Sequence, residues 1–229
     1  MKALLSALLL GVVGLHAGVT VAEETPAQRL VQAVSALNEV QADLGAAVPF
    51  AFLQSARAIA VLPGVVKVGL VLGGQIGEGV ISVRGPDDRW GPPAFIELKA
   101  GSLGWQAGVE QSDVVLVFRS DEAMRKLIDG NLNLGGDVGI TVGHASKQID
   151  SATTIRYRSE VQSYARARGL YAGMSFEGAD LSPNVDANAS LYGAEFADII
   201  AGQAGSIPGA AREFMNTLEK LAPAGGTTQ

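Results

Sequence analysis

The chain has 229 residues, 48% of them hydrophobic and 17% charged, so it can bury a sizeable core and does not have the composition of a disordered protein. Its net charge of −6 argues against a general attraction to nucleic acid, and an anionic partner would have to meet a local basic patch. The sequence contains no cysteine, which excludes disulfides, thiolate nucleophiles, iron–sulfur clusters and cysteine-ligated zinc.

The first 22 residues have the pattern of a secretory signal peptide. Lys2 supplies a positive start, and residues 3–15 are an uncharged apolar run, shorter than the about 20 residues that span a bilayer. Small residues stand at positions −3 and −1 of the junction between Ala22 and Glu23, where we expect cleavage. The remaining residues 23–229 are expected to form one domain in the periplasm or cell envelope. An uncleaved anchor is the alternative.

A helix is predicted directly after this segment, and short strands follow it. Thr25 and Gln28 have the spacing of a capping box, Pro26 is at the first helical position, and apolar residues recur at helical spacing until Gly45. After a short helical turn at Pro49, proline and glycine divide a stretch poor in charge into strand-length pieces. Strands are expected near residues 58–62, 65–73, 79–84, 94–99, 104–109 and 113–119.

The second half of the chain is predicted to mix helices and strands. A short helix capped by Ser120 ends at Gly130. Two further helices are expected near the C-terminus, one opened by Ser182-Pro183 and one by Pro208. Between the helix that ends at Gly130 and the helix opened by Ser182-Pro183, strands are expected at residues 137–142, 153–158, 161–167 and 170–176, with the last two forming a hairpin.

Glycine recurs inside the predicted strands, in segments at residues 73–79, 101–108 and 135–143. Glycine weakens a strand unless a bend or a close backbone approach requires it. We therefore expect an α+β fold in which a strongly coiled, barrel-like antiparallel β-sheet has helices at its N- and C-terminal ends. None of these segments has the spacing of a phosphate-binding loop, which favours a packing role for the glycines.

The sequence carries no motif typical of an enzyme. No G-x-S-x-G nucleophile elbow is present. A serine triad or a metal site would depend on His144, because His16 lies in the predicted signal peptide. A hydrolase built around His144 is one alternative; our prediction is a protein that is not an enzyme and has no catalytic residue, metal or cofactor.

Four arginines lie close together in the second half of the chain. Alternation along a strand places Arg156 and Arg158 on one face, and likewise Arg166 and Arg168. Glu160 is the one acid in this stretch of sequence. The arginines fit either the solvated outer face of a half-exposed sheet or a local anion-binding site on an otherwise acidic protein.

A series of short motifs extends over residues 48–193 in chain order. Among them are Ala56-Arg57-Ala58-Ile59-Ala60-Val61, Val65-x-Lys67-x-Gly69, Trp90-Gly91-Pro92-Pro93, Gly101-Ser102-x-Gly104-x-Gln106, Ser163-Tyr164-Ala165-Arg166-Ala167-Arg168-Gly169-Leu170 and Leu191-Tyr192-Gly193. In this order they resemble the SYLF domain, a lipid-binding domain that is also described in eukaryotes as an actin-binding module.

The resemblance implies binding of membrane lipids, with phosphoinositides as the eukaryotic ligand class. Because the expected export separates the protein from actin, we expect an anionic phospholipid or membrane surface of the bacterial envelope as the ligand, and no nucleic acid. The predicted headgroup site, here named the basic strip, consists of Lys67, Arg156, Arg158, Arg166 and Arg168. Apolar side chains of the first helix are expected to enter the membrane interface. The alternative is a structural or protein-interaction domain without a specific lipid.

Polar residues of the matching motifs are expected to be structural. Their neighbours are glycines and apolar strand residues, so we predict that they are buried and hydrogen-bonded, since burial without a partner costs about 1–3 kcal/mol each. They are Ser102, Gln106, Asp113, Asp137 and Asn188.

Overall fold

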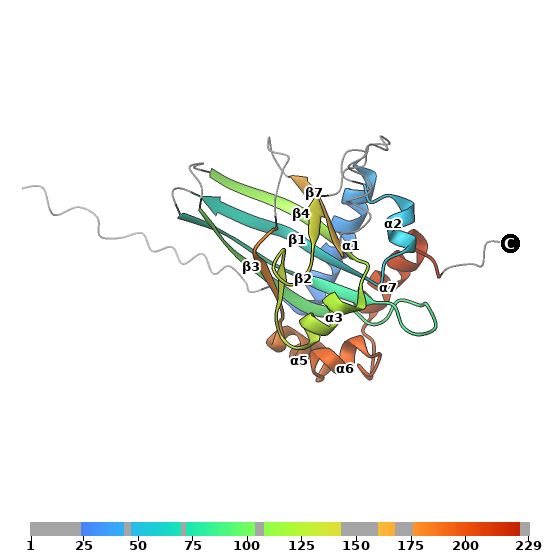
Figure 1. Ribbon diagram of the computed structural model, residues 1–229. Coiled ribbons are helices and arrows are strands. Elements are labelled where there is room, and N and C mark those ends of the chain that lie inside the picture. Colours follow the sequence, from blue (N-terminus) through green and yellow to red (C-terminus); the bar gives the residue numbers. More distant parts are fainter. Residues whose placement is uncertain are drawn as a thin grey trace, which may run out of the picture.

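The computed structural model describes residues 24–43, 47–69, 72–103, 108–142, 160–167 and 176–224 as strands, helices and their connections (Figure 1). The strands are β1 (Ala58–Gly69), β2 (Leu72–Val83), β3 (Ala94–Leu103), β4 (Gly108–Phe118), β5 (Leu132–Leu134), β6 (Ile140–Val142), β7 (Val161–Ala167) and β8 (Ala179–Pro183). The helices are α1 (Pro26–Ala42), α2 (Phe50–Gln54), α3 (Asp121–Ile128), α5 (Val185–Tyr192), α6 (Phe196–Ile200) and α7 (Gly209–Leu221).

The strands form one sheet in the order β5-β8-β3-β2-β1-β4-β7-β6. All neighbouring pairs are antiparallel except β6 and β7, which are parallel. The two edge strands, β5 and β6, are consecutive in the chain, and a bridge between Leu134 and Val138 brings the two edges together. The sheet is therefore barrel-like and nearly closed. The predicted α+β class is confirmed, with the parallel pair as the departure from an antiparallel sheet.

Helix α1 forms as the capping box predicts. The hydroxyl of Thr25 accepts a hydrogen bond from the Gln28 amide, and the Gln28 side chain accepts one from the Thr25 amide. Its apolar stripe, including Leu30 and Leu37, is completely buried between the sheet and α7. The prediction that this stripe enters a membrane is therefore wrong, because the sheet already covers it.

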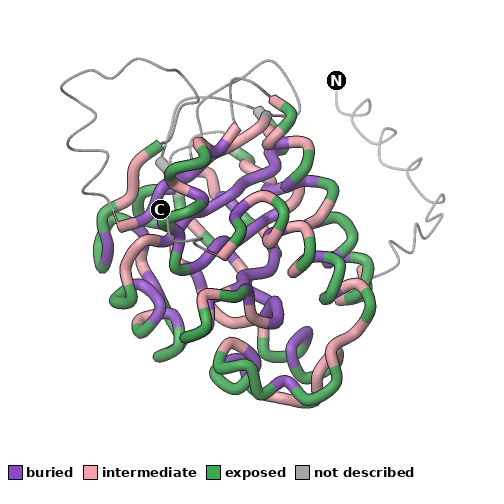
Figure 2. Tube along the Cα trace, turned by 90° about the vertical axis from the view of Figure 1, so that its right-hand side faces the viewer, coloured by how far each residue is buried: buried purple, intermediate pink, exposed green. Residues whose placement is uncertain are grey.

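The central strands are buried on both faces. Ala58 and Ala60 of β1 face the interior of the curved sheet, whereas Ile59 and Val61 face the helices α1 and α7. Helix α3 contributes Leu127 to the interior core. Figure 2 shows the result: buried stretches run through the middle of the molecule, and exposed residues occupy the periphery.

The predicted strands at 58–62 and 65–73 are one strand as far as Gly69, whereas residues 72–73 belong to β2, so the prediction missed the reversal between β1 and β2. The register of β1 shifts between Leu62 and Val65, with Gly64 at a φ of +59°, so Pro63-Gly64 makes a bulge and the chain does not turn back there. Likewise, residues 108–109 of the predicted strand at 104–109 belong to β4 together with the predicted strand at 113–119, whereas residues 104–107 lie outside the described residues.

Other predicted elements differ in extent. The hydroxyl of Ser120 caps α3 as expected, but α5 begins after Asn184 and not at Ser182-Pro183. The short elements β5, β8 and α6 were missing from the prediction. The expected strand at residues 153–158, and residues 170–175 of the last one, lie outside the described residues.

Two strand glycines permit the close approach of β1 and β2. A Cβ atom at Gly79 would lie 2.2 Å from the Val61 carbonyl oxygen, and one at Gly77 would lie 2.7 Å from a methyl group of Val65. A larger residue at Gly79 would require the backbone of β1 to move, and one at Gly77 would require the Val65 side chain to move. This confirms the packing role expected of the glycines there.

The two ends of the sheet differ. At the capped end, where β2 ends at Val83 and β4 at Phe118, the helices α3, α5 and α6 pack around the strands (Figure 1). At the opposite end, here named the tip end, strands β1 to β4 project beyond the helices on the left of Figure 1. The tip end comprises residues 66–69, 72–76, 99–103 and 108–111.

Candidate functional site

Arg166, the described arginine of the basic strip, is surrounded by carboxylates. Its Nη1 lies 2.6 Å from Oε2 of Glu39 and 3.7 Å from Oδ2 of Asp113, and its Nε lies 3.9 Å from Oδ2 of Asp43. Asp113 is fully buried and also accepts a hydrogen bond from the amide of Gly64 at 2.9 Å. The guanidinium therefore ties the end of α1 to strands β4 and β7, and a phosphate would have to compete with these acids.

Lys67 lies on the other face of the sheet. It pairs with Gln75 of β2 and Glu110 of β4, and strand alternation places all three on the interior face at the tip end. Lys67 is half-buried and forms no ion pair with any residue that the structure describes. Beside it, a buried oxygen of Glu110 and the hydroxyl of Ser112 have no hydrogen-bond partner among the described residues.

The structure thus separates the two described members of the basic strip. Lys67 faces the interior, whereas Arg166 shares the helix-covered face with the buried Tyr164. Arg156, Arg158 and Arg168, together with His144, lie outside the described residues. The basic strip as a whole stays a prediction.

The buried polar residues at the capped end are satisfied. Asn188 accepts a hydrogen bond from the Phe95 amide at 2.8 Å and donates to the carbonyl oxygens of Phe95 and Asn184, each at 2.9 Å. With the buried Asp113, this confirms the structural role predicted for these two residues. The side chain of Ser102 and all of Gln106 lie outside the description.

Asp137 is hydrogen-bonded as predicted, but it is exposed and not buried. Its carboxylate accepts from the Asn133 amide at 2.9 Å and lies 3.4 Å from Nζ of Lys126. The backbone hydrogen bond from Asn133, with a smaller contribution from Lys126, holds the pKa of Asp137 below its usual value.

Arg84 and Trp90 fasten the end of α7 to the sheet. The Trp90 indole donates to the Ala222 carbonyl at 2.8 Å, and the Arg84 guanidinium stacks on the indole at 4.2 Å from the ring centre. Arg84 also donates to the carbonyl oxygens of Ala56 and Ala222, and desolvation lowers its pKa. Sequence reasoning found Trp90 in a motif but missed Arg84, which no motif singled out.

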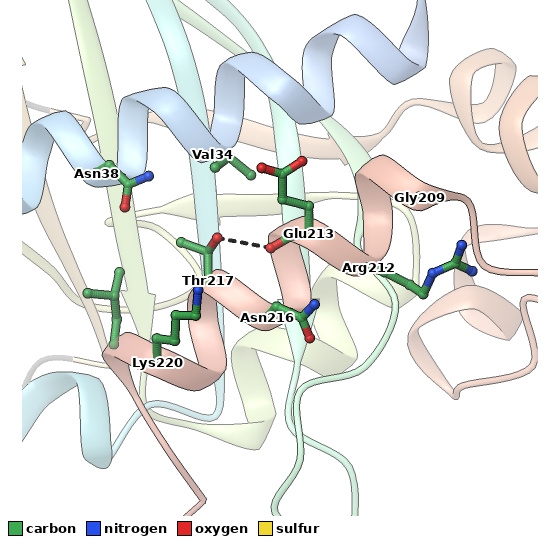
Figure 3. Close-up of a pocket in the computed structure, with 9 residues that line it drawn as sticks. Val34, Asn38, Gly209, Arg212, Glu213, Asn216, Thr217 and Lys220 are labelled. Atoms are coloured by element: carbon green, nitrogen blue, oxygen red, sulfur yellow. Dashed lines mark hydrogen bonds between the residues drawn. The ribbon is translucent and has the colours of Figure 1, made fainter.

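A first groove, of about 570 Å³, lies between α1 and α7 (Figure 3). Its polar lining includes Asn38, Arg212, Glu213 and Lys220. Figure 3 shows that Arg212 and Lys220 extend in different directions, so the two cations do not converge on one point.

A second groove, of about 370 Å³, borders the tip end. It contains Arg29, which is ion-paired with Glu78, and Lys99, whose Nζ lies 2.7 Å from Glu97. The cations of this groove are therefore already matched by acids.

Two further features bear on the possible chemistry. Within the described ranges, histidine, aspartate and glutamate side chains form no group of three that could hold a metal ion. None of the described helices has the length and apolar character needed to cross a membrane.

Residues 99–221 match the Ysc84 family, described as "Las17-binding protein actin regulator". SH3 domain-containing YSC84-like protein 1 of Xenopus laevis is 33% identical over 147 residues, which cover 64% of this chain and 44% of that protein. The human protein of the same name is 31% identical over 146 residues, covering 63% and 42%. Protein YSC84 of Saccharomyces cerevisiae is 31% identical over 180 residues, covering 76% and 38%.

The chain spans less than half the length of these curated relatives. The family description names a regulator and no catalytic activity. Because the matched residues make up more than half of the sequence and include the motifs from Gly101 onward, the chain belongs to the Ysc84 family, whose domain is the SYLF domain.

Proposed function

We propose that this protein is a non-enzymatic phospholipid-binding module of the bacterial cell envelope and that it binds anionic headgroups. The observation that carries the proposal is the position of Lys67 at the tip end, where it has no ion-pair partner among the described residues. The signal-peptide pattern of residues 1–22 supports location in the envelope.

The distribution of charge supports an anionic ligand at this end. The strand segments of the tip end contain Lys67, Lys99 and Glu110, and the whole chain has a net charge of −6. Lys99 is paired with Glu97, so Lys67 is the cation of these segments that forms no ion pair with a described residue. In sequence, Arg168 directly follows Ala167, the last residue of β7. An unpaired cation on an acidic protein favours contact of the surrounding surface with an anionic membrane.

The sequence suggests that Arg166 binds a headgroup, but in the structure its guanidinium contacts carboxylates of the protein. Its contacts with Glu39 and Asp113 give it a role in holding α1 on the sheet, so Arg166→Ala tests the fold as well as ligand binding. Lys67 and Arg168 are therefore the members of the basic strip to change first.

Vesicle flotation tests the proposal. The chain without residues 1–22 is expected to float with phosphatidylglycerol vesicles and much less with phosphatidylcholine vesicles, and binding should weaken as salt rises, because the Debye length is about 8–10 Å near physiological salt. A near-surface cation contributes about 1 kcal/mol, so Lys67→Gln should weaken binding about fivefold. Lys220→Gln, an exposed lysine on α7, is the matched control and should bind like the wild type.

Equal flotation with both lipids, or an unchanged Lys67→Gln variant, would contradict headgroup binding through Lys67. Absence of flotation with every lipid would favour the second candidate, a structural or protein-interaction domain. Two observations favour that candidate: the family is described as Las17-binding, and Arg166 is occupied by carboxylates.

A further inference from the structure

The outer face of the tip end carries apolar side chains that are open to solvent, with Lys99 and Gln111 beside them. Val68, Ile76 and Val109 have exposed fractions of 48%, 62% and 75%. Val68 lies directly opposite Val109 across the β1–β4 pair, and Ile76 lies opposite Val66 across the β1–β2 pair. We name the side chains of Val66, Val68, Ile76 and Val109 the tip patch.

The tip patch continues the face that α1 covers elsewhere. Strand alternation puts Val109 on the same face of β4 as Val115, which is buried beneath the helices. In Figure 1 the strands extend past α1. The exposed fractions of Val68, Ile76 and Val109 show that this end of the face is not covered by the described helices.

Glycines keep the patch open. Gly74 pairs with Val68 on one side and with Gly101 on the other, so two neighbouring positions on this face have no side chain. A Cβ atom added at Gly101 would meet nothing within 4 Å. The valine and isoleucine side chains therefore project from a flat surface.

The chain segments that join these strands are also free of acids. Leu70-Val71 joins β1 to β2, and residues 104–107, which include Trp105, join β3 to β4. Leu70-Val71 is wholly apolar in sequence. Apolar and aromatic residues beside lysines are the composition of segments that lie in a membrane interface.

We propose that the tip patch is the membrane-contact surface and that it inserts into the interface of an anionic phospholipid bilayer, while Lys67 and Lys99 remain among the headgroups. This inference rests on the proposed function and adds which end of the protein faces the membrane. The last residues of β1, from Val66 to Gly69, span about 10 Å, comparable to the 5–10 Å depth reached by interfacial segments. Insertion of the α1 apolar stripe would require unfolding, because that stripe is buried in the fold. Insertion of the tip patch requires none, because Val68, Ile76 and Val109 are already exposed.

Single-cysteine variants test the inference sharply because the natural sequence has no cysteine. Val109→Cys and Ile76→Cys are labelled with an environment-sensitive fluorophore. Val31→Cys on α1 and Val185→Cys on α5 are matched controls, since these valines are 57% and 72% exposed. With vesicles of equimolar phosphatidylglycerol and phosphatidylcholine, the first two labels should shift to the blue and be quenched by brominated lipid, and the two controls should not.

Unlabelled variants measure the contribution to affinity. Val109→Gln combined with Ile76→Gln should weaken flotation about tenfold or more, because two apolar side chains lose their burial in the interface. Val31→Gln combined with Val185→Gln should leave flotation unchanged. The melting temperatures of both double variants should stay near that of the wild type, because all four side chains are exposed.

Three outcomes would overturn the inference. Labels at 76 and 109 that report water while the wild-type protein floats would place the lipid elsewhere and leave the proposed function standing. Absence of wild-type flotation would overturn both proposals. A wild-type dimer that Val109→Gln converts to a monomer in sedimentation would assign the tip patch to contact between two copies of the chain.

Discussion

The capped end and the tip end of the sheet differ in whether their polar groups are hydrogen-bonded and their strands are covered by helices. At the capped end, buried polar groups such as Arg84 and Asn188 are hydrogen-bonded to the backbone, and helices cover the strands. At the tip end, Val109 is exposed on the outer face, and on the inner face Glu110 has a buried carboxylate oxygen without a described partner.

This difference places the residues that stabilise the fold and the residues that are available for binding at opposite ends of the strands. A group that is buried and paired contributes to folding, whereas exposed apolar groups and unpaired buried polar groups are available to a ligand. Substitutions at the capped end should therefore change the free energy of unfolding, and substitutions at the tip end should change binding. The predictions below test that division.

Two glycines in neighbouring strands give the largest expected contrast. Gly79→Ala places a Cβ atom 2.2 Å from the Val61 carbonyl oxygen and 2.8 Å from Cα of Leu62, so backbone must move, and we expect a loss of about 3 kcal/mol in unfolding free energy. Gly101→Ala at the tip end meets nothing within 4 Å and should change stability by less than about 0.5 kcal/mol. Urea denaturation of both variants measures the difference.

Equal losses for the two glycine variants would contradict this division, because they would show that the tip end is packed as tightly as the rest of the sheet. A Gly79→Ala protein with normal stability would show that β1 and β2 can separate at the bulge without cost.

Arg84→Met should destabilise the protein by about 3 kcal/mol. The substitution keeps an apolar side chain beside Trp90 but leaves the carbonyl oxygens of Ala56 and Ala222 without their charged donor. Because Ala222 follows α7, the C-terminus should loosen first, and limited proteolysis should cut it sooner than in the wild type. Flotation of the folded variant should be unchanged; a variant that folds normally and loses lipid binding would place Arg84 in the binding site.

Asn188→Ala should lower the unfolding free energy by about 2 kcal/mol. The amide and carbonyl of Phe95 both pair with this side chain, and their burial without a partner is costly. Asn184→Ala, which removes the cap of α5, is a useful comparison and should cost about 1 kcal/mol. If the two variants lost the same amount of unfolding free energy, the role of Asn188 in joining α5 to β3 would be contradicted.

The helices were predictable because their signals are local. The capping box of Thr25 and Gln28 and the cap at Ser120 depend on neighbours within one helical turn. The extent of the strands was less predictable. Pro63-Gly64 is compatible with a turn or with a bulge, and only pairing with both β2 and β4 decides between them. The parallel pair β6–β7 depends on closure of the whole sheet, for which no local signal exists.

The site was predicted less completely than the fold. Alternation predicted that Arg166 projects from a strand, but the strand's partner surface determines that it meets Glu39 of α1. Lys67 and Arg166 were grouped by charge, and the structure puts them on opposite faces because strand β1 contains a bulge that the sequence does not reveal. The sequence does not distinguish the exposed valines of the tip end from valines of the core. Their exposure depends on where α1 covers the sheet, which the sequence pattern does not predict.

The smallest expected effect concerns the turn that closes the sheet. Asp137 lies between β5 and β6, and the Asn133 amide and Lys126 stabilise its charged form, which lowers its pKa in the folded state. This contribution to stability is therefore complete above the unfolded pKa of about 4 and is lost as the pH falls through the lower folded value. Asp137→Asn should lower the melting temperature slightly at pH 7, and the difference from the wild type should shrink as the pH is lowered below about 4. The side chain is exposed, so the effect should stay small. A difference in melting temperature that remains constant from pH 7 to the acid range would show that the carboxylate's charge does not help to close the sheet.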